Sequence, residues 1–241
     1  MLIRSWNVYH GMTVPPGRRG HLEEAVSLVT ADGPDVVCLQ EVPLWGLPKL
    51  ESWSGMTVLL ASARRVWFPP RLGGWITRLN QGFFRSGISG QGNATLLADG
   101  LEPLEHRCVK ISRGQRERRI CLAVRLEGLV IGNLHASGIA GHPEVGAAEI
   151  ARALAFIEEF ARPGDALVLA GDFNLRRRDF PPLHGWSLLG PGIDHILVRD
   201  AEASPLEVWP EARRTTESGV LSDHAPIELT VGIDDSGKLD G

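Results

Sequence analysis

The chain has 241 residues, of which 43% are hydrophobic and 22% are charged, enough to bury the core of one large domain. Its formal net charge of -4 excludes a protein that binds polyanions through overall charge, so any such attraction must be local. Three widely separated cysteines, Cys38, Cys108 and Cys121, have no CxxC spacing, which excludes a disulfide framework and a structural zinc site.

The first residues predict a strand and not a targeting segment. Met1 leads directly into an alternating sequence that ends at Trp6, without the basic and apolar regions of a secretory signal. No apolar run reaches the ~20 residues that a membrane-spanning helix requires. We therefore expect a soluble, cytoplasmic protein without a transmembrane segment, and we expect a monomer.

Short apolar runs rich in valine, isoleucine and leucine recur along the chain between residues that favour turns. Runs of this kind are typical of strands, because branched side chains pack well on a pleated sheet. The predicted strands are Leu2–Asn7, Asp35–Gln40, Met56–Ala61, Ala94–Ala98, Ile120–Leu126, Leu129–His135, Ala166–Ala170, Ile193–Val198 and Ala225–Val231.

Two segments instead carry apolar residues at the spacing of an amphipathic helix. One extends from Leu22 to Val29 and the other from Ala147 to Ile157. The second follows Pro143, which suits a first helical turn, and precedes Pro163 and Gly164, which favour a helix end.

Many strands with only two long helices favour stacked sheets with helices packed outside them, because each apolar sheet face needs a covering layer. We therefore predict an α+β fold in a single domain over residues 1–233. The polar, glycine-containing sequence of residues 234–241 predicts a flexible C-terminal tail.

Polar residues follow or flank several predicted strands, where a sheet presents side chains along one edge. They are Asn7, Glu41, His135, Asp172, Asn174, Asp194, Asp223 and His224. Alone, each residue is as typical of turn chemistry or packing as of a functional site, but their shared position indicates one site. Their carboxylate and amide oxygens are hard ligands, which favour Mg²⁺ or Mn²⁺ over Zn²⁺. Because Mg²⁺ keeps several waters, one firm protein ligand can suffice.

The same residues lie in six short motifs. They are Ser5-Trp6-Asn7, Leu39-Gln40-Glu41, Asn133-Leu134-His135, Gly171-Asp172-Phe173-Asn174, Ile193-Asp194-His195 and Ser222-Asp223-His224. In this order, from Ser5 to His224, they resemble the endonuclease/exonuclease/phosphatase superfamily of DNase I-like enzymes. Weaker likenesses are Gly92-Asn93-Ala94 and the strand from Arg119 to Arg125.

The resemblance implies a four-layer α/β/β/α sandwich, in which two packed, mainly antiparallel sheets lie between helices and the site lies at one end. It also implies that Glu41 is the principal metal ligand, that Asn7 assists at the metal or phosphate, and that Asp223 binds the metal or a water. The catalytic domain would then be the whole of residues 1–233.

Catalytic roles follow from the same resemblance. Asp172 would orient or deprotonate the attacking water, and Asn174 would stabilise the transition state. His224 would contact the scissile phosphate with Asp194 fixing its ring, and His135 would be a second phosphate contact. A metal and two imidazoles would neutralise the phosphate oxygens. The charge of Asp194 would raise the pKa of His224, which could then serve as a cation or acid at neutral pH. Metal and substrate can provide the rest of the barrier reduction without a covalent intermediate, so no serine or cysteine nucleophile is required.

Further polar and basic residues are candidates for binding substrate. Asn93, Arg119 and Arg176 are the strongest of these, and Arg176 is followed by Arg177 and Arg178 close to the Asp172 motif. Arg113, Arg116, Arg118 and Arg119 form another cluster. Each charge run is also typical of a solvated surface.

The stretch from Ala61 to Ala98 contains no aspartate or glutamate. It has five arginines and five aromatic residues between positions 64 and 85. They are Arg64, Arg65, Arg71, Arg78, Arg85, Trp67, Phe68, Trp75, Phe83 and Phe84. The stretch is interpreted either as an arm that binds phosphates, bases or a lipid interface, or as an irregular loop with solvated arginines.

The remaining histidines and the sole tyrosine receive structural interpretations. His195 is expected to pack in the core, because strand alternation directs it away from Asp194. Tyr9 is expected to pack in a strand or loop, and His10, His21, His106, His142 and His184 lie outside the motif positions.

Three functions are compatible with these features of the sequence. The first is a divalent-metal-dependent, nuclease-type phosphodiesterase that acts on nucleic acid, favoured by the arginines around the motif-bearing loops. The second is a phospholipid or phosphoinositide phosphodiesterase, similar to sphingomyelinases, or a phosphatase, with the aromatic pairs as interfacial anchors. The third, a non-catalytic binding module, is disfavoured because every motif position is filled.

Overall fold

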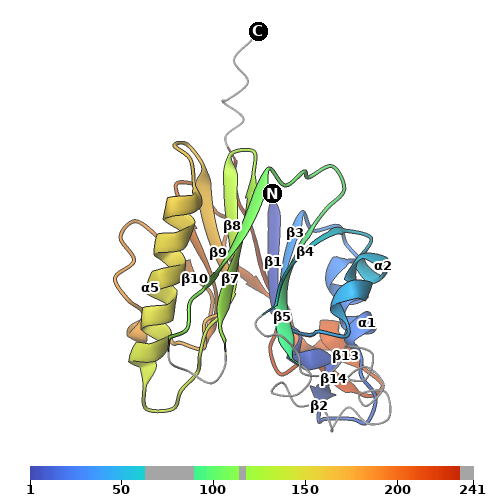
Figure 1. Cartoon of the computed structure of the whole chain (residues 1–241). Helices are drawn as coiled ribbons and strands as arrows, with labels where there is room; N and C mark the ends of the chain where they lie inside the picture. Colours follow the sequence, from blue (N-terminus) through green and yellow to red (C-terminus); the bar gives the residue numbers. More distant parts are fainter. Residues whose placement is uncertain (63–89, 114–117, 234–241) are drawn as a thin grey trace.

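The computed structural model describes residues 1–62, 90–113 and 118–233. The arginines and aromatic residues of the predicted arm, together with Arg116 and the predicted C-terminal tail, lie outside these ranges. Two six-stranded sheets lie face to face between helices in the described part of the chain (Figure 1).

The first sheet has the strand order β12-β15-β1-β3-β5-β4. Its strands are β1 (Leu2–Asn7), β3 (Val36–Pro43), β4 (Thr57–Ser62), β5 (Gln91–Leu97), β12 (Glu207–Val208) and β15 (Ile227–Thr230). Only β1 and β3 pair in parallel, so the sheet is mainly antiparallel.

The second sheet has the order β10-β11-β9-β8-β7-β6. Its strands are β6 (Glu105–Lys110), β7 (Ile120–Leu126), β8 (Leu129–His135), β9 (Ala166–Asp172), β10 (Ser187–Leu189) and β11 (Asp194–Arg199). Here only β8 and β9 pair in parallel. A small third sheet of β2 (Thr13–Val14), β14 (Gly219–Leu221) and β13 (Thr215–Thr216) lies at the lower end of the first sheet in Figure 1.

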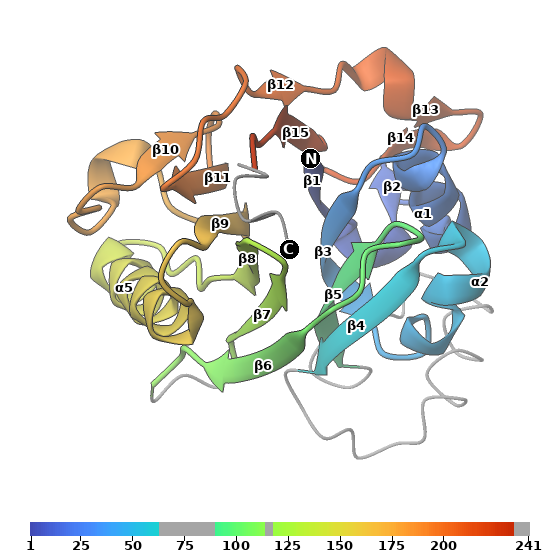
Figure 2. The same cartoon turned by 90° about the horizontal axis from the view of Figure 1, so that it is seen from above.

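Helices cover the two outer faces of the sandwich, as the view from above shows (Figure 2). Helix α5 (Pro143–Phe160) covers the second sheet, and α1 (Leu22–Thr30) and α2 (Leu50–Ser54) cover the first. Four 3-10 turns are also present in the described residues, at Tyr9–Gly11, Leu47–Lys49, Arg177–Asp179 and Glu211–Arg214.

Three apolar cores hold these layers together. The central core lies between the sheets and includes Ile3, Val124 and Val168. The other two cores lie beneath the helices, one with Ile150 against the second sheet and one with Val26 against the first. Because each sheet has apolar side chains on both faces, neither could be stable without both of its neighbouring layers.

The predicted α+β sandwich is confirmed, and every predicted strand and both helices are present, three strands with the predicted bounds and the other elements with ends shifted by a few residues. The prediction missed β6, whose sequence Glu-His-Arg-Cys-Val-Lys is mostly polar and exposed. Such a sequence is tolerated because β6 is an edge strand that pairs only with β7. It also missed β10 and the two-residue strands, which are too short to carry an alternating pattern.

Candidate active site

Strand alternation brings the motif residues to one end of the space between the sheets. In β8, Ile131 lies in the central core. His135, four residues later, points to the same face of the sheet, because side chains two or four residues apart in a strand share a face. Val168 and Asp172 are related in the same way in β9. Apolar rows that fill the core therefore end in polar side chains. The residues placed in this way are Asn7, His135, Asp172 and Asp194.

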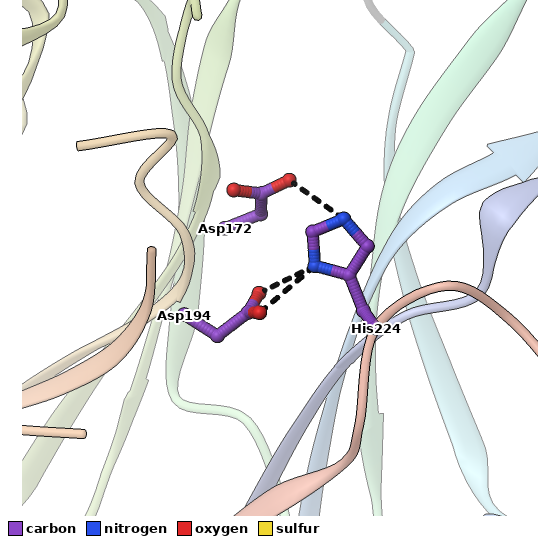
Figure 3. Close-up of side chains that lie close together, drawn as sticks. All are labelled: Asp172, Asp194 and His224. Atoms are coloured by element: carbon purple, nitrogen blue, oxygen red, sulfur yellow. Dashed lines mark hydrogen bonds and ion pairs between the residues drawn. The ribbon is translucent and has the colours of Figure 1, made fainter. Parts of the chain in front are cut away.

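The register of strand pairing places three of these residues side by side on adjacent strands. Asp172 lies opposite His135 of β8 on one side and opposite Asp194 of β11 on the other. The two carboxylates face the ring of His224, which comes from the turn between β14 and β15 (Figure 3). Residues far apart in the sequence thus surround one small space.

His224 is held by two aspartates. Its Nδ1 lies 2.8 Å from Asp194 Oδ2, and its Nε2 lies 3.8 Å from Asp172 Oδ2 (Figure 3). Burial disfavours the charged ring, but the hydrogen bond and charge of Asp194 outweigh burial and raise the pKa of His224 to about 9. The expected Asp194–His224 pair is present, and the ring is a cation at neutral pH.

The first and last motifs are joined to each other. Trp6 donates a hydrogen bond from Nε1 to His224 O at 2.9 Å. Ser222 donates from Oγ to Asn7 O at 2.6 Å and accepts the backbone N–H of His224 at 3.1 Å. These contacts fix the backbone that carries the His224 ring.

Asp172 lies at the centre of the site and is almost fully buried. Its Oδ2 accepts a hydrogen bond from Asn7 Nδ2 at 2.9 Å, and its Oδ1 accepts the backbone N–H of Asn174 at the same distance. Burial, followed by the negative charge of Asp194, raises the pKa of Asp172 to about 7. The carboxylate is therefore poised between its two protonation states near neutral pH.

Asn174 and Asp223 flank this centre. Asn174 donates from Nδ2 to Ala136 O at 3.1 Å, which ties it to the segment that follows β8. Asp223 is half-exposed, and its Oδ1 lies 3.8 Å from His224 Nε2. Burial raises the pKa of Asp223, and the charge of Glu41 acts in the same direction.

Glu41 lies opposite this group on the first sheet, directly after the inward-facing Gln40. Its Oε1 is 3.7 Å from His135 Nε2. Burial opposes ionisation, but the hydrogen bond and charge of His10 outweigh it, and the pKa of Glu41 is lowered to about 2. Glu41 is therefore a permanent carboxylate.

His10 is a site residue that the sequence analysis left without a role. Its Nε2 lies 2.9 Å from Glu41 Oε2, and its Nδ1 lies 3.1 Å from Glu41 O. Tyr9 also faces the acidic group: burial raises its pKa, as do the charges of Asp223 and Glu41. The available signal was their position, two and three residues beyond Asn7 in the first motif.

His135 differs from the expectation that both imidazoles carry charge. Arg119 Nη1 lies 2.9 Å from His135 Nδ1 and 3.1 Å from His135 Nε2, and a guanidinium can only donate, so at least one ring nitrogen accepts and carries no proton. Burial, followed by the charge of Arg119, lowers the pKa of His135 to about 3. The permanent cation at this position is Arg119, and His135 is neutral.

The backbone at the site is strained. Six non-glycine residues in the described part have positive φ, and five of them belong to the site segments: Tyr9, His10, Glu41, Asn174 and Ser222. Such conformations cost about 1–3 kcal/mol each and persist only where the surrounding structure enforces them. Glu41, for example, has a φ of 54° and lies where the pairing of β3 with β5 shifts register between Leu39 and Val42.

A shallow pocket opens beside His135. Besides His135, its described lining includes Gln91, Asn93, Arg118, Arg119 and Ile120, and none of the described lining residues carries a carboxylate. Asn93 is buried and donates from Nδ2 to Ile120 O and to Asn133 O. Arg118 is exposed and forms no ion pair with another described residue. The pocket is therefore suited to an anionic group.

The other basic and imidazole candidates are not joined to the site. Arg176 is exposed, and within the described ranges no contact links its side chain to the residues around Asp172. His195 is buried between Phe173 and Phe180, and its Nε2 lies 3.2 Å from Leu175 O. His195 thus packs on the outer face of its sheet, as alternation predicts.

The donor set fits a hard divalent cation. Glu41 is permanently ionised, and carboxylates dominate the surrounding side chains. One ligand atom each from Asp172, Asp194 and His224 lies within 4.8 Å of the others, so this group could also hold a metal ion. Nδ1 of His224, however, already forms its hydrogen bond with Asp194.

The sequence from residue 5 to residue 224 matches the Endonuclease/Exonuclease/phosphatase family. This match spans nearly the whole chain and both ends of the site just described. The chain belongs to this family, whose members include phosphoester hydrolases. No curated protein matches it closely enough in sequence to count as a relative.

Solved structures share the fold at low sequence identity. Truncated TDP2 from Caenorhabditis elegans is 15% identical with a TM-score of 0.69, and the match covers 95% of this chain and 96% of that one. A functionally unknown conserved protein from Enterococcus faecalis is 16% identical with a TM-score of 0.72, covering 97% and 100%. A mannosyl-6-phosphatase from Bacteroides thetaiotaomicron is 14% identical with a TM-score of 0.65, covering 96% and 99%.

These three structures share the DNase I-like sandwich, and of their names that of the mannosyl-6-phosphatase alone states a substrate. Among the helices that the structure describes here, none is long and apolar enough to cross a membrane.

Proposed function

We propose that this protein is a divalent-metal-dependent phosphodiesterase of the nuclease type, in which Asp172 activates a water molecule. The observation that carries the proposal is the convergence of the two sheets on Asp172. Asn7 of the first sheet is 2.9 Å from its Oδ2, and His224 is 3.8 Å from the same oxygen. A general base, a cation and hydrogen-bond donors therefore surround a single space.

Glu41 is the principal ligand of Mg²⁺ or Mn²⁺ in this proposal, with Asn7 and Asp223 assisting. The low pKa of Glu41 supports this role, because a cation then displaces no proton from the carboxylate. The bound metal would neutralise charge on the phosphate oxygens.

Asp172 accepts a proton from water as the water oxygen bonds to phosphorus and the ester oxygen leaves. Asn174 stabilises the additional charge on the phosphorus oxygens. His224, held as a cation by Asp194, contacts the phosphate and can return a proton to the leaving oxygen. Arg119 supplies positive charge behind the neutral His135, which contacts the phosphate as a hydrogen-bonding group.

A nucleic acid is the substrate class that the charged surroundings favour. Arg118, Arg119 and Asn93 line the pocket beside His135, so a phosphate next to the scissile one would meet two guanidinium groups. Arg176, two residues beyond Asn174, is proposed as a further phosphate contact. The local positive charge contrasts with the net charge of -4.

The second candidate is a phospholipid or phosphoinositide phosphodiesterase or a phosphatase that uses the same residues. The fold shared with a mannosyl-6-phosphatase favours keeping this alternative, since the catalytic group does not itself distinguish monoesters from diesters. A non-catalytic module remains disfavoured, because the carboxylates, histidines and asparagine of the motifs converge.

We also propose that residues 1–233 form one catalytic domain and that the protein acts as a cytoplasmic monomer. Contacts between Trp6 and His224 support the single domain, because they join the two ends of the range.

A hydrolysis panel with Mg²⁺ or Mn²⁺ tests the substrate class. Single- and double-stranded DNA and RNA, phospholipid vesicles, inositol phosphates and sugar phosphates would be compared, with Asp172→Asn as the control. We expect nucleic acid cleavage that weakens as salt rises and falls by about 10²–10⁴ in Asp172→Asn. Turnover of a lipid or sugar phosphate with intact nucleic acid would instead establish the second candidate.

A further inference from the structure

The proposed site is divided between the two sheets. His135, Asp172 and Asp194 lie on strands of the second sheet, whereas Asn7 and Glu41 lie on strands of the first. A relative shift of the sheets would change every distance across the site. The apolar side chains of the central core hold the sheets together but do not fix their register, because apolar contacts have no direction.

Two fully buried amide side chains interrupt this apolar interface directly beneath the site. Gln40 immediately precedes Glu41, and Asn133 is two residues before His135. Both belong to motifs, and neither has a role in the proposed chemistry. We name this pair the inter-sheet clasp.

The two side chains of the clasp are bonded to each other across the interface. Gln40 donates from Nε2 to Asn133 Oδ1 at 2.9 Å. The same nitrogen lies 3.2 Å from Ser5 Oγ and 3.1 Å from Cys38 O, so it is also anchored to its own sheet. Gln40 therefore connects strands β1 and β3 with β8.

The side chain of Asn133 forms its hydrogen bonds with the opposite sheet. Its Nδ2 lies 2.9 Å from Ala94 O and 3.2 Å from Leu39 O, which belong to β5 and β3. Asn93 of β5 makes a parallel connection, from Nδ2 to Ile120 O and Asn133 O. Hydrogen bonds have defined lengths and directions, so this set fixes both the spacing and the register of the sheets.

Burying amides between sheets is unfavourable unless they are hydrogen-bonded, and an apolar pair would fill the space without fixing the register of the sheets. We propose that Gln40 and Asn133 are positioning residues that hold the Glu41 half of the site against the Asp172 half. This inference rests on the proposed function, because it assigns the clasp to that catalytic geometry.

A double-mutant cycle with Gln40→Met and Asn133→Leu tests the clasp. Turnover of bis(p-nitrophenyl) phosphate with Mg²⁺ would be measured in each variant, with Val124→Ala, in the central core, as the destabilising control. We expect kcat to fall about 10–100-fold in each single variant, as for residues that orient ligands. The double variant should fall little further than the worse single, because the two residues share one hydrogen bond.

Val124→Ala should lower thermal stability while leaving kcat within about twofold, since it is remote from the site. Variants of the clasp that lose stability as this control does but keep kcat would overturn the proposal. If Asn133→Leu does not fold, Gln40→Met carries the test, because it leaves the bonds from Asn133 to the first sheet in place.

Crystal structures of the wild type and Gln40→Met separate this inference from the proposed function. We expect the distance from Asn7 Nδ2 to Asp172 Oδ2, now 2.9 Å, to lengthen in the variant. An unchanged distance would overturn the clasp even if the enzyme is active. If the wild type hydrolyses no phosphoester, the proposed function fails, and this distance alone decides whether the clasp positions the two halves.

Discussion

Asp172 and His224 face each other across 3.8 Å, and the surroundings of each raise its pKa. Burial and then Asp194 raise the pKa of Asp172 to about 7, while Asp194 outweighs burial and raises that of His224 to about 9. Between these values Asp172 is ionised as a base and His224 is protonated. Burial of Asp172 thus sets the lower end of this pH range, and the hydrogen bond and charge of Asp194 on His224 set its upper end.

Hydrolysis should follow a bell-shaped dependence on pH. We expect kcat/KM to rise through an acidic limb that ends near pH 7 and to fall through pH 9, with a bound cation moving the acidic limb lower. Asp194→Asn should move the alkaline limb down, because His224 loses its charged partner. A rate that is level from about pH 5 to pH 10, or an unmoved alkaline limb, would contradict this account.

The same histidine links stability to pH. Its pKa is raised above the unfolded value of 6.5 to about 9, so it stabilises the folded state fully below pH 6.5, and this contribution is lost as pH rises through 9. The free energy of unfolding of the wild type should therefore exceed that of Asp194→Asn by less and less as the pH rises from 6.5 through about 9.

His10 contacts both the carboxylate and the backbone carbonyl of Glu41. His10→Ala should therefore weaken Mg²⁺ binding by about 10–100-fold in calorimetric titrations, as loss of a group that orients a metal ligand does. The matched control is His21→Ala, which removes a comparable 2.9 Å contact, with Glu24, at the start of α1. Equal Mg²⁺ affinities in wild type and His10→Ala would remove His10 from the site.

Helix α5 contributes to the site through one buried carboxylate. Glu149 accepts the backbone N–H of Ser137 at 2.7 Å and the Ser137 hydroxyl at 3.0 Å. The preceding residue, Ala136, accepts the side-chain amide of Asn174. Gly138 completes the arrangement, because a Cβ there would lie 2.7 Å from Asn174 Oδ1. The helix thus holds the segment against which Asn174 rests.

Glu149→Ala should lower the free energy of unfolding by about 1–3 kcal/mol, because it leaves the N–H and hydroxyl of Ser137 without their buried partner. Urea denaturation measures this change, and kcat should fall as well because Asn174 loses its support. Glu159→Ala, on the exposed face of the same helix, should change stability by less than about 0.5 kcal/mol. Equal effects from the two substitutions would rule out a supporting role for α5.

Strands with branched apolar residues were predictable because local pattern and tertiary burial agree in them. The bounds of β1, β7 and β8 match the prediction. In β6 the pattern is absent, because an edge strand needs few buried side chains. The small sheet of β2, β13 and β14 depends on contacts between segments about 200 residues apart, which no local pattern records.

The site was predictable to the extent that its residues lie in ordered motifs at strand ends. Tyr9 and His10 were missed because their positions depend on a left-handed backbone that the sequence does not reveal. The neutral state of His135 was missed because it depends on Arg119, which lies on a neighbouring strand segment. The inter-sheet clasp required knowing which strands face each other across the interface.

At the scale of the whole molecule, the two sheets together form the proposed metal-dependent hydrolytic site, in which Glu41 and Asp172 come from different layers. Its most direct test is turnover of bis(p-nitrophenyl) phosphate after metal removal by EDTA and during Mg²⁺ titration, in wild type, Glu41→Gln and Asp172→Asn. We expect EDTA to abolish turnover, Mg²⁺ to restore it, Glu41→Gln to require more Mg²⁺, and Asp172→Asn to remain about 10²–10⁴-fold slower at saturating Mg²⁺. Turnover that survives EDTA, or an Asp172→Asn variant as fast as the wild type, would contradict the account.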